Sequence, residues 1–268
     1  MRAGVSTACL YPMPTEDALY DLALAGVTHV EIFINTHAEL RDTFIYNLAD
    51  ILQRFDMTCK SVHPYTSELE TLMLFSNYPR RLQDYLEYCK LYFSAMEKLG
   101  ATIFVLHGSR APAASVNRAE YFERYELLSE TAAQFGVTVA QENVARCAGG
   151  SLDFLKDMKD KLGKKVCFVL DIKQAVRAKE DPLQMLRTLG ENVAHVHMSD
   201  HGTYGDCLLV GQGRFQVQTF LDTLATYSPN CSVILELYRS GFGSTADLAK
   251  NYHLLENMLV KAQGGKKE

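Results

Sequence analysis

The chain has 268 residues, of which 47% are hydrophobic, so it is long enough to bury one large core. Its formal net charge is −5 and no run of lysine and arginine exceeds a pair, which argues against a surface built for nucleic acid. The sequence lacks an apolar run long enough to cross a membrane or to form a signal peptide, and its seven cysteines are scattered without a C-x-x-C pair, so it predicts a reduced, cytoplasmic protein.

Short apolar runs alternate with longer amphipathic runs along the chain, which is typical of a parallel α/β fold. The predicted strands are 4–8, 27–34, a third that ends at 63, 101–106, 137–140, 166–170, 193–196 and 232–235. The predicted helices are one that begins at 15, then 40–55, a long one that ends at 99, 117–135, 151–163, 182–189, 215–227 and 244–262, with a loop at 64–79. This pattern predicts a single-domain (β/α)8 TIM barrel over residues 1–262 and a disordered tail at 263–268.

Six of the predicted strands end within two residues of a side chain that can bind a metal ion. In chain order these residues are His63, His107, Glu142, Asp171, His197 and Glu236. In a TIM barrel the carboxyl ends of all strands open onto one face, where active sites lie. Three histidines and three carboxylates are therefore expected to meet in one pocket and to form a divalent-metal enzyme site.

The predicted ligands of the metal are Glu142, Asp171, His197 and Glu236, which come from four adjacent strands. Three carboxylates and one imidazole form a hard, oxygen-rich set of donors. Such a set favours Mn2+, Co2+ or Mg2+, with Zn2+ as an alternative.

His63 and His107 lie on the two strands before Glu142. Two roles are open for them. They either bind a second metal ion that shares Glu142, or they contact the substrate.

Other polar residues near the predicted strand ends are candidates for supporting roles. His195 lies on the same face of its strand as His197 but deeper, so it is predicted to pack inside the barrel. Asp200 is a candidate for orienting His197 or for contacting substrate, and His201 is a candidate for contacting substrate. For Glu31, a substrate contact is slightly favoured over an ion pair.

Two loops with a G-x-G pattern, 211–213 and 241–243, follow the last two strands, where TIM barrels often bind a phosphate. Lys173, Arg214 and Arg239 are nearby cations, and Arg239 is the candidate among them for substrate binding. Because the G-x-G pattern is common, these loops by themselves predict no phosphate site.

The motifs resemble those of the xylose isomerase-like TIM-barrel superfamily, which contains tagatose and psicose 3-epimerases, inosose dehydratase and the type IV apurinic endonucleases. The resemblance covers nearly the whole chain and is most specific at AQENV around Glu142, LDIKQA around Asp171, the H-x-x-D pattern that begins at His197, the first G-x-G loop, and ILELY around Glu236. It implies that these four residues are the metal ligands and that the two glutamates also move a proton on the substrate.

The chain departs from the family pattern at two places. Members of both branches commonly carry a histidine three residues after the aspartate ligand, where this chain has Gln174, a candidate for substrate binding. The endonucleases also carry a D-x-H pair before the G-x-G loop, where this chain has Gly205 and Cys207. This loss makes a third zinc ion unexpected.

The favoured function is therefore a metal-dependent isomerase or epimerase that acts on a sugar or sugar phosphate through an enediolate, and dehydration of a keto-polyol is a variant of the same chemistry. The alternative is a two-metal phosphodiesterase of the apurinic-endonuclease type, which six donors favour and the acidic charge disfavours. A non-enzymatic sugar-binding barrel is disfavoured because the four central ligands are intact. The sequence leaves open whether the protein forms a homo-oligomer. The aromatic residues at 85–93 form either an interface or, as favoured, a helix face packed on the barrel.

Overall fold

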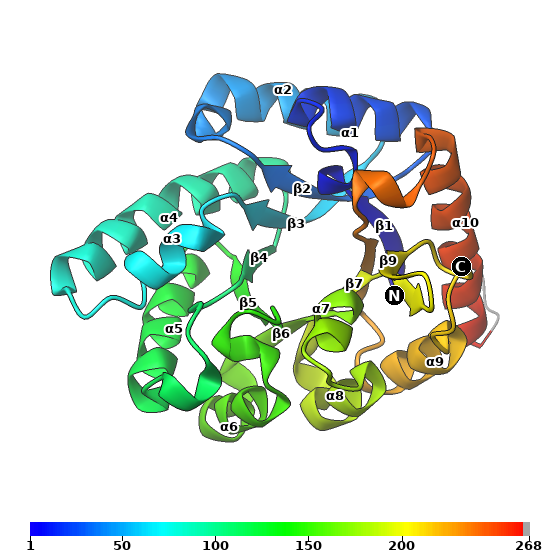
Figure 1. Ribbon diagram of the computed structural model, residues 1–268. Helices are drawn as coiled ribbons and strands as arrows, with labels where there is room; N and C mark the ends of the chain where they lie inside the picture. Colours follow the sequence, from blue (N-terminus) through cyan, green and yellow to red (C-terminus); the bar gives the residue numbers. More distant parts are fainter. Residues whose placement is uncertain (265–268) are drawn as a thin grey trace.

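The computed structural model describes residues 1–264, which form a closed barrel of parallel strands surrounded by helices (Figure 1). The barrel strands are β1 (Arg2–Ser6), β2 (His29–Ile34), β3 (Thr58–Pro64), β4 (Ile103–Leu106), β5 (Thr138–Glu142), β6 (Cys167–Asp171), β7 (Val193–Met198) and β10 (Ser232–Leu235). Each strand pairs in parallel with the next, and β10 closes the barrel against β1. The predicted (β/α)8 TIM barrel is confirmed.

The helices lie outside the barrel and connect its strands (Figure 1). They are α1 (Thr15–Leu24), α2 (Asp42–Arg54), α3 (Ser67–Leu72), α4 (Pro79–Leu99), α5 (Arg118–Ala133), α6 (Leu152–Leu162), α7 (Ile172–Arg177), α8 (Pro182–Leu189), α9 (Val217–Tyr227) and α10 (Thr245–Ala262). Asn117 and Ser151 cap α5 and α6 through their side-chain oxygens, and Gly100 ends α4 in the left-handed region at φ 69°. These boundaries follow from local sequence.

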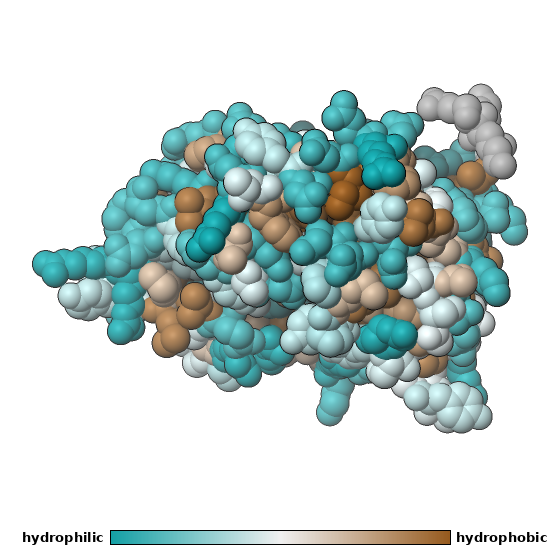
Figure 2. All heavy atoms as spheres, turned by 90° about the horizontal axis from the view of Figure 1, so that it is seen from above, coloured by the Kyte–Doolittle hydropathy of each residue, from teal (hydrophilic) through white to brown (hydrophobic). Residues whose placement is uncertain are grey.

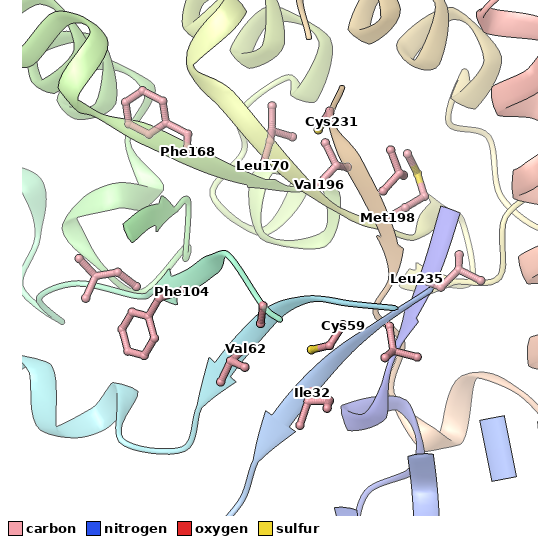
Figure 3. Packing of buried hydrophobic residues seen from close by; sticks show 14 of the residues in the cluster. Ile32, Cys59, Val62, Phe104, Phe168, Leu170, Val196, Met198, Cys231 and Leu235 are labelled. Atoms are coloured by element: carbon pink, nitrogen blue, oxygen red, sulfur yellow. The ribbon is translucent and has the colours of Figure 1, made fainter. Parts of the chain in front are cut away.

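The alternation of side chains along the strands produces two apolar layers. The larger layer lies between strands and helices, and Figure 3 shows part of it, including Val62, Phe104 and Leu170. The smaller layer lies inside the barrel and consists of Ile103, Val105, Ala140 and Val169. Along β4 to β6 the residue two positions beyond this inner layer is a predicted site residue, so on this side the barrel interior changes from apolar to polar toward its mouth.

The aromatic residues at 85–93 belong to the core, as favoured. Tyr85, Tyr92 and Phe93 are buried, and the last two pack against Phe104 with ring centroids 5.6 and 5.3 Å away. Seen from above, the surface is largely hydrophilic, with hydrophobic residues in small separate groups (Figure 2). Among residues 1–264, no helix has the length and apolar character needed to cross a membrane.

The sequence pattern misses three elements near the mouth. The helix α3 interrupts the predicted loop 64–79, α7 directly follows β6, and a hairpin of β8 (Asp200–Gly202) and β9 (Gly205–Leu208) follows β7. Both helices have only six residues, too few to show an apolar period. Of the predicted tail 263–268, the first two residues form a turn after α10 and the last four lie outside the described residues.

Candidate metal and active site

The four predicted ligands meet at the carboxyl-terminal mouth of the barrel. Glu142 and Asp171 are the last residues of β5 and β6, His197 lies one residue before the end of β7, and Glu236 directly follows β10. The strand register places Asp171 beside His197. Each of the four side chains offers one ligand atom, and these atoms all lie within 4.8 Å of one another. The fold therefore brings the four donors close enough together to hold one ion.

The imidazole of His197 is held between two sets of carboxylates. Its Nε2 lies 3.1 Å from Oε2 of Glu31. Its Nδ1 faces the mouth and lies 3.3 Å from Glu142 Oε1, 3.6 Å from Glu236 Oε2 and 3.8 Å from Asp171 Oδ2. Because the ionised Glu31 can only accept, Nε2–H donates to it, and Nδ1 is the nitrogen left to bind a metal.

The favoured role of Glu31 as a substrate contact is wrong. Its side chain is fully buried, accepts a hydrogen bond from Ser61 Oγ at 2.8 Å, and lies 3.2 Å from Nε2 of His195. Burial raises the pKa of Glu31, but His197 and the hydrogen bonds from both histidines hold that pKa well below its ordinary value. Glu31 is thus an ion-pair partner that orients His197, and His195 packs inside the barrel as predicted.

Lys173, which the sequence suggested only as a nearby cation, lies inside the cluster. Its Nζ lies 2.7 Å from Glu236 Oε2 and 3.3 Å from Asp171 Oδ2, and its side chain is only 6% exposed. Burial lowers the pKa of Lys173, but the two carboxylates raise it well above its ordinary value. For Glu236 burial acts in the opposite direction and raises the pKa, but Lys173 and His197 bring that pKa down to about 2. The position of Lys173, two residues after a strand-end aspartate, is the sequence signal that could have revealed this contact.

Two carboxylate oxygens of the cluster, Oε2 of Glu142 and Oδ2 of Asp171, are buried and accept no well-aligned hydrogen bond, although His107 Nε2 lies 3.0 Å from the first and Lys173 Nζ 3.3 Å from the second. The other oxygen of Asp171 accepts the backbone N–H of Gln174 at 2.9 Å. An acceptor buried without a donor costs free energy, and a cation bound beside it removes that cost. These free oxygens and the oxygen-rich donor set fit a divalent ion.

His63 and His107 form a second group of donors on the other side of Glu142. Nε2 of His107 lies 3.0 Å from Glu142 Oε2 and 2.9 Å from Nε2 of His63. Burial and the neighbouring His107 lower the pKa of His63 to about 4, whereas Glu142 raises the pKa of His107 against the effect of burial. The three residues also offer ligand atoms within 4.8 Å of one another. Both open roles, second metal and substrate contact, therefore stay predictions.

Asp200 does not contact His197, so its predicted orienting role is wrong. Its side chain is buried, and its two oxygens accept four backbone N–H groups at 2.7 to 3.0 Å, from His201, Gly211, Gly213 and Phe215. A β-carbon at Gly213 would clash with this carboxylate, which explains why the G-x-G loop carries glycine there. Asp200 builds the loop after β7, and Glu31 is the residue that orients His197.

The other three candidates for substrate binding lie around the mouth and contact protein groups of the strand-end loops. The side-chain oxygen of Gln174 accepts a backbone N–H from the loop after β5 at 3.1 Å. Arg239 donates to the carbonyl oxygen of Phe242 at 2.9 Å, and the ring of His201 packs on Phe215 at 5.3 Å. Their role in binding substrate stays a prediction.

The comparison with known families identifies the chain. A family model described as xylose isomerase-like TIM barrel matches residues 19–258. The chain belongs to the xylose isomerase-like TIM-barrel family. A search of curated proteins found no match.

Solved structures cover this barrel almost end to end. They include a D-tagatose 3-epimerase-like protein, with 19% identity, 99% of each chain covered and a TM-score of 0.80. A D-allulose 3-epimerase from Methylomonas sp. in complex with D-allulose has 15% identity over 95% of this chain and 96% of that chain, with a TM-score of 0.77. The IOLI protein with a bound zinc atom has 16% identity over 100% of both chains and a TM-score of 0.75. At these identities the structures establish the shared fold.

The mouth of this xylose isomerase-like barrel is most accessible at two of the donors. The side chains of His107 and Glu236 are 14% and 13% exposed, whereas those of Glu142, Asp171 and His197 are at most 2% exposed. A small molecule that enters the mouth therefore reaches His107 and Glu236 first.

Proposed function

We propose that the protein is a divalent-metal-dependent isomerase or epimerase that moves a proton next to the carbonyl group of a sugar or sugar phosphate. The observation that carries this proposal is the pair of glutamates, Glu142 and Glu236, in one buried donor group with Asp171 and His197. Moving a proton between two carbons, or between two faces of one carbon, requires one group to remove it and another to return it. The epimerases among the similar structures support this reaction class.

Both glutamates are ready to accept a proton. Burial raises the pKa of Glu142, but His107 and His197 hold it well below its ordinary value, and the pKa of Glu236 is lowered to about 2. One carboxylate removes the proton next to the carbonyl and leaves an enediolate. The other carboxylate takes up a proton from solvent and delivers it to the other carbon or the other face. Which glutamate acts first depends on the face of the substrate that each one meets.

Glu142, Asp171, His197 and Glu236 are the residues that would hold the metal. When bound, a divalent ion polarises the carbonyl group and so acidifies the neighbouring C–H bond. The hard donor set favours Mn2+, Co2+ or Mg2+, and the zinc-bound IOLI protein supports Zn2+ as an alternative. Gln174, His201 and Arg239 are the proposed substrate contacts, and a cytoplasmic location agrees with seven free cysteines.

The test has two steps. Equilibrium dialysis of the protein against Mn2+, Co2+ or Mg2+, read by elemental mass spectrometry, should find about one equivalent bound per chain, since the four donors form one site. Ketoses, aldoses and their phosphates are then incubated with the protein in D2O and screened for isomers that carry solvent deuterium. For a substrate found in this way, Glu236→Gln at saturating metal should lower turnover by about 10²- to 10⁴-fold.

The matched control for this variant is Glu191→Gln, which neutralises an exposed glutamate just before the amino end of β7, whereas His197 lies near the carboxyl end of that strand. It should retain wild-type turnover. Two outcomes would contradict proton transfer by the two glutamates. One is full turnover in Glu236→Gln, and the other is formation of isomers without deuterium although the carboxyl groups of the site exchange freely with D2O.

The second candidate function is two-metal hydrolysis of a phosphodiester, and the group of His63, His107 and Glu142 favours it. It predicts two or more equivalents of zinc per chain and cleavage of DNA at abasic sites. The net charge of −5 disfavours it, because phosphate contacts supply much of the affinity for DNA. A single equivalent of metal and no cleavage would remove this candidate.

A further inference from the structure

Lys173 lies among the carboxylates that the proposed metal site needs. Its ammonium contacts Glu236 Oε2 at 2.7 Å and Asp171 Oδ2 at 3.3 Å. These are the same oxygens through which the two carboxylates approach Nδ1 of His197, at 3.6 and 3.8 Å. A metal ion bound at Nδ1 and the ammonium of Lys173 would therefore share the same two oxygens.

The start of α7 explains why this lysine points into the mouth. Asp171 caps the helix, because its Oδ1 accepts the backbone N–H of Gln174. The helix therefore begins directly after the last residue of β6, and its second residue, Lys173, has to lie beside the strand end. The other oxygen of Asp171 accepts no hydrogen bond, and among residues 1–264 the basic side chains within 4.0 Å of it are Lys173 and His197.

We propose that Lys173 is an internal cation that competes with the divalent ion for Asp171 and Glu236 and so keeps the metal weakly bound and exchangeable. This inference rests on the metal site of the proposed function. Without a metal, the ammonium offsets part of the repulsion among three buried carboxylates. With a metal bound, two like charges face each other in a site that solvent screens poorly, and the ammonium is driven away from the oxygens.

The ring of Tyr238 offers the displaced ammonium another partner. Its centroid lies 5.1 Å from Nζ of Lys173, within the range of a cation–π interaction. A rotation of the lysine side chain toward this ring would free the two oxygens without breaking α7. The same ring also carries the guanidinium of Arg177, whose Cζ lies 5.3 Å from the centroid, so the displaced ammonium would share the ring with a second cation.

Removal of the ammonium should tighten metal binding. Lys173→Met keeps most of the apolar stem and loses the charge, so we expect the dissociation constant for Mn2+ to fall at least about tenfold, a small part of the interaction of charges this close. The measurement is isothermal titration of Mn2+ into metal-free protein, wild type against variant. It requires no substrate and no turnover.

Two controls separate the local effect from a change in net charge or in folding. Lys179→Met removes one positive charge at an exposed position six residues further along and should leave the affinity unchanged, and Lys173→Arg should stay close to wild type. Thermal unfolding with and without Mn2+ shows whether each variant folds, and Lys173→Gln replaces Lys173→Met if the latter does not.

The outcomes distinguish this inference from the proposed function. If the wild type binds Mn2+ and Lys173→Met binds it equally or more weakly, Lys173 supports the ligands and the competition is refuted while the metal site stands. If neither protein binds a divalent ion, the metal site of the proposed function fails and the competition fails with it. Tighter binding in Lys173→Met, or in Lys173→Gln where it replaces that variant, with unchanged binding in Lys179→Met and Lys173→Arg, establishes the competition.

Discussion

The end of β6 and the loop after β7 each carry a buried aspartate, and the two aspartates differ in what their oxygens contact. Asp171 and Asp200 are both only 1% exposed. Each oxygen of Asp200 accepts two backbone N–H groups, whereas Asp171 accepts one N–H group on Oδ1 and none on Oδ2. Burial alone therefore does not separate a structural carboxylate from a ligand. Between these two aspartates the difference is Oδ2 of Asp171, which faces Lys173 and His197 rather than backbone N–H groups and can therefore turn to a cation.

Asp171→Asn is expected to have the largest effect, and it tests whether Asp171 is a metal ligand. The amide keeps the size of the side chain and the cap of α7 but loses the charge beside the site. We expect metal affinity to fall by more than about 100-fold, beyond the 10- to 100-fold loss typical of residues that only orient a ligand. The stability of the metal-free protein should hold or rise, because a buried like charge is removed. Titration calorimetry and denaturant unfolding measure the two quantities, and an affinity within about threefold of wild type would exclude Asp171 as a ligand.

Asp200→Asn should give the reverse pattern. An amide cannot accept on both sides, so two of the four backbone N–H groups lose their acceptor and the loop that begins at β8 loosens. We expect the free energy of unfolding to fall by about 2–4 kcal/mol, since hydrogen bonds to a charged acceptor are among the stronger ones. Metal affinity, measured well below the unfolding temperature, should change by less than about threefold. A large loss of metal affinity at unchanged stability would mean that Asp200 supports metal binding rather than the loop.

Local signals account for the part of the fold that the sequence predicts. The run at 101–106 is entirely apolar apart from Thr102, Gly100 stops the helix before it, and Asn117 caps the helix after it. Such features depend on a few neighbouring residues and repeat around the barrel. The helix α7 carries no such signal, because it has six residues and its cap is the side chain of Asp171, a residue that also reads as a strand end.

The sequence predicts the site residues that end a strand, because the barrel topology alone places them at the mouth. It does not predict the roles of residues that depend on their depth inside the barrel. Glu142 and Asp171 end their strands, so the barrel places them at the mouth whatever the loops do. Glu31 lies in the middle of β2, beside Ser61 of β3, and this position inside the barrel makes it a partner of His197 rather than of a substrate. Lys173 was expected in solvent. The helix α7 starts at the mouth, however, and this start points the side chain of Lys173 toward the carboxylates of the site.

Glu31→Gln should lower metal affinity by less than Asp171→Asn does, and the loss should depend on pH in a characteristic way. In the metal-free protein burial lowers the pKa of His197, but Glu31, followed by Glu236, raises it well above 6.5. Binding of a metal at Nδ1 displaces this proton, so wild-type affinity falls as the pH decreases below the raised pKa. Gln no longer stabilises the imidazolium, so the steep part of the profile should move to lower pH. Because the imidazole also becomes a weaker donor, affinity at high pH should fall about tenfold.

Titration calorimetry of Mn2+ across the pH range on both sides of neutrality, in two buffers with different ionisation enthalpies, counts the protons released. Wild type should release about one proton per ion near neutral pH, and Glu31→Gln should release fewer. Ser61→Ala, which removes a hydroxyl that donates to Glu31 but leaves its charge, is the matched control and should keep the wild-type profile. An identical profile in Glu31→Gln would mean that the proton on His197 does not compete with the metal, and hence that Nδ1 of His197 is not a ligand.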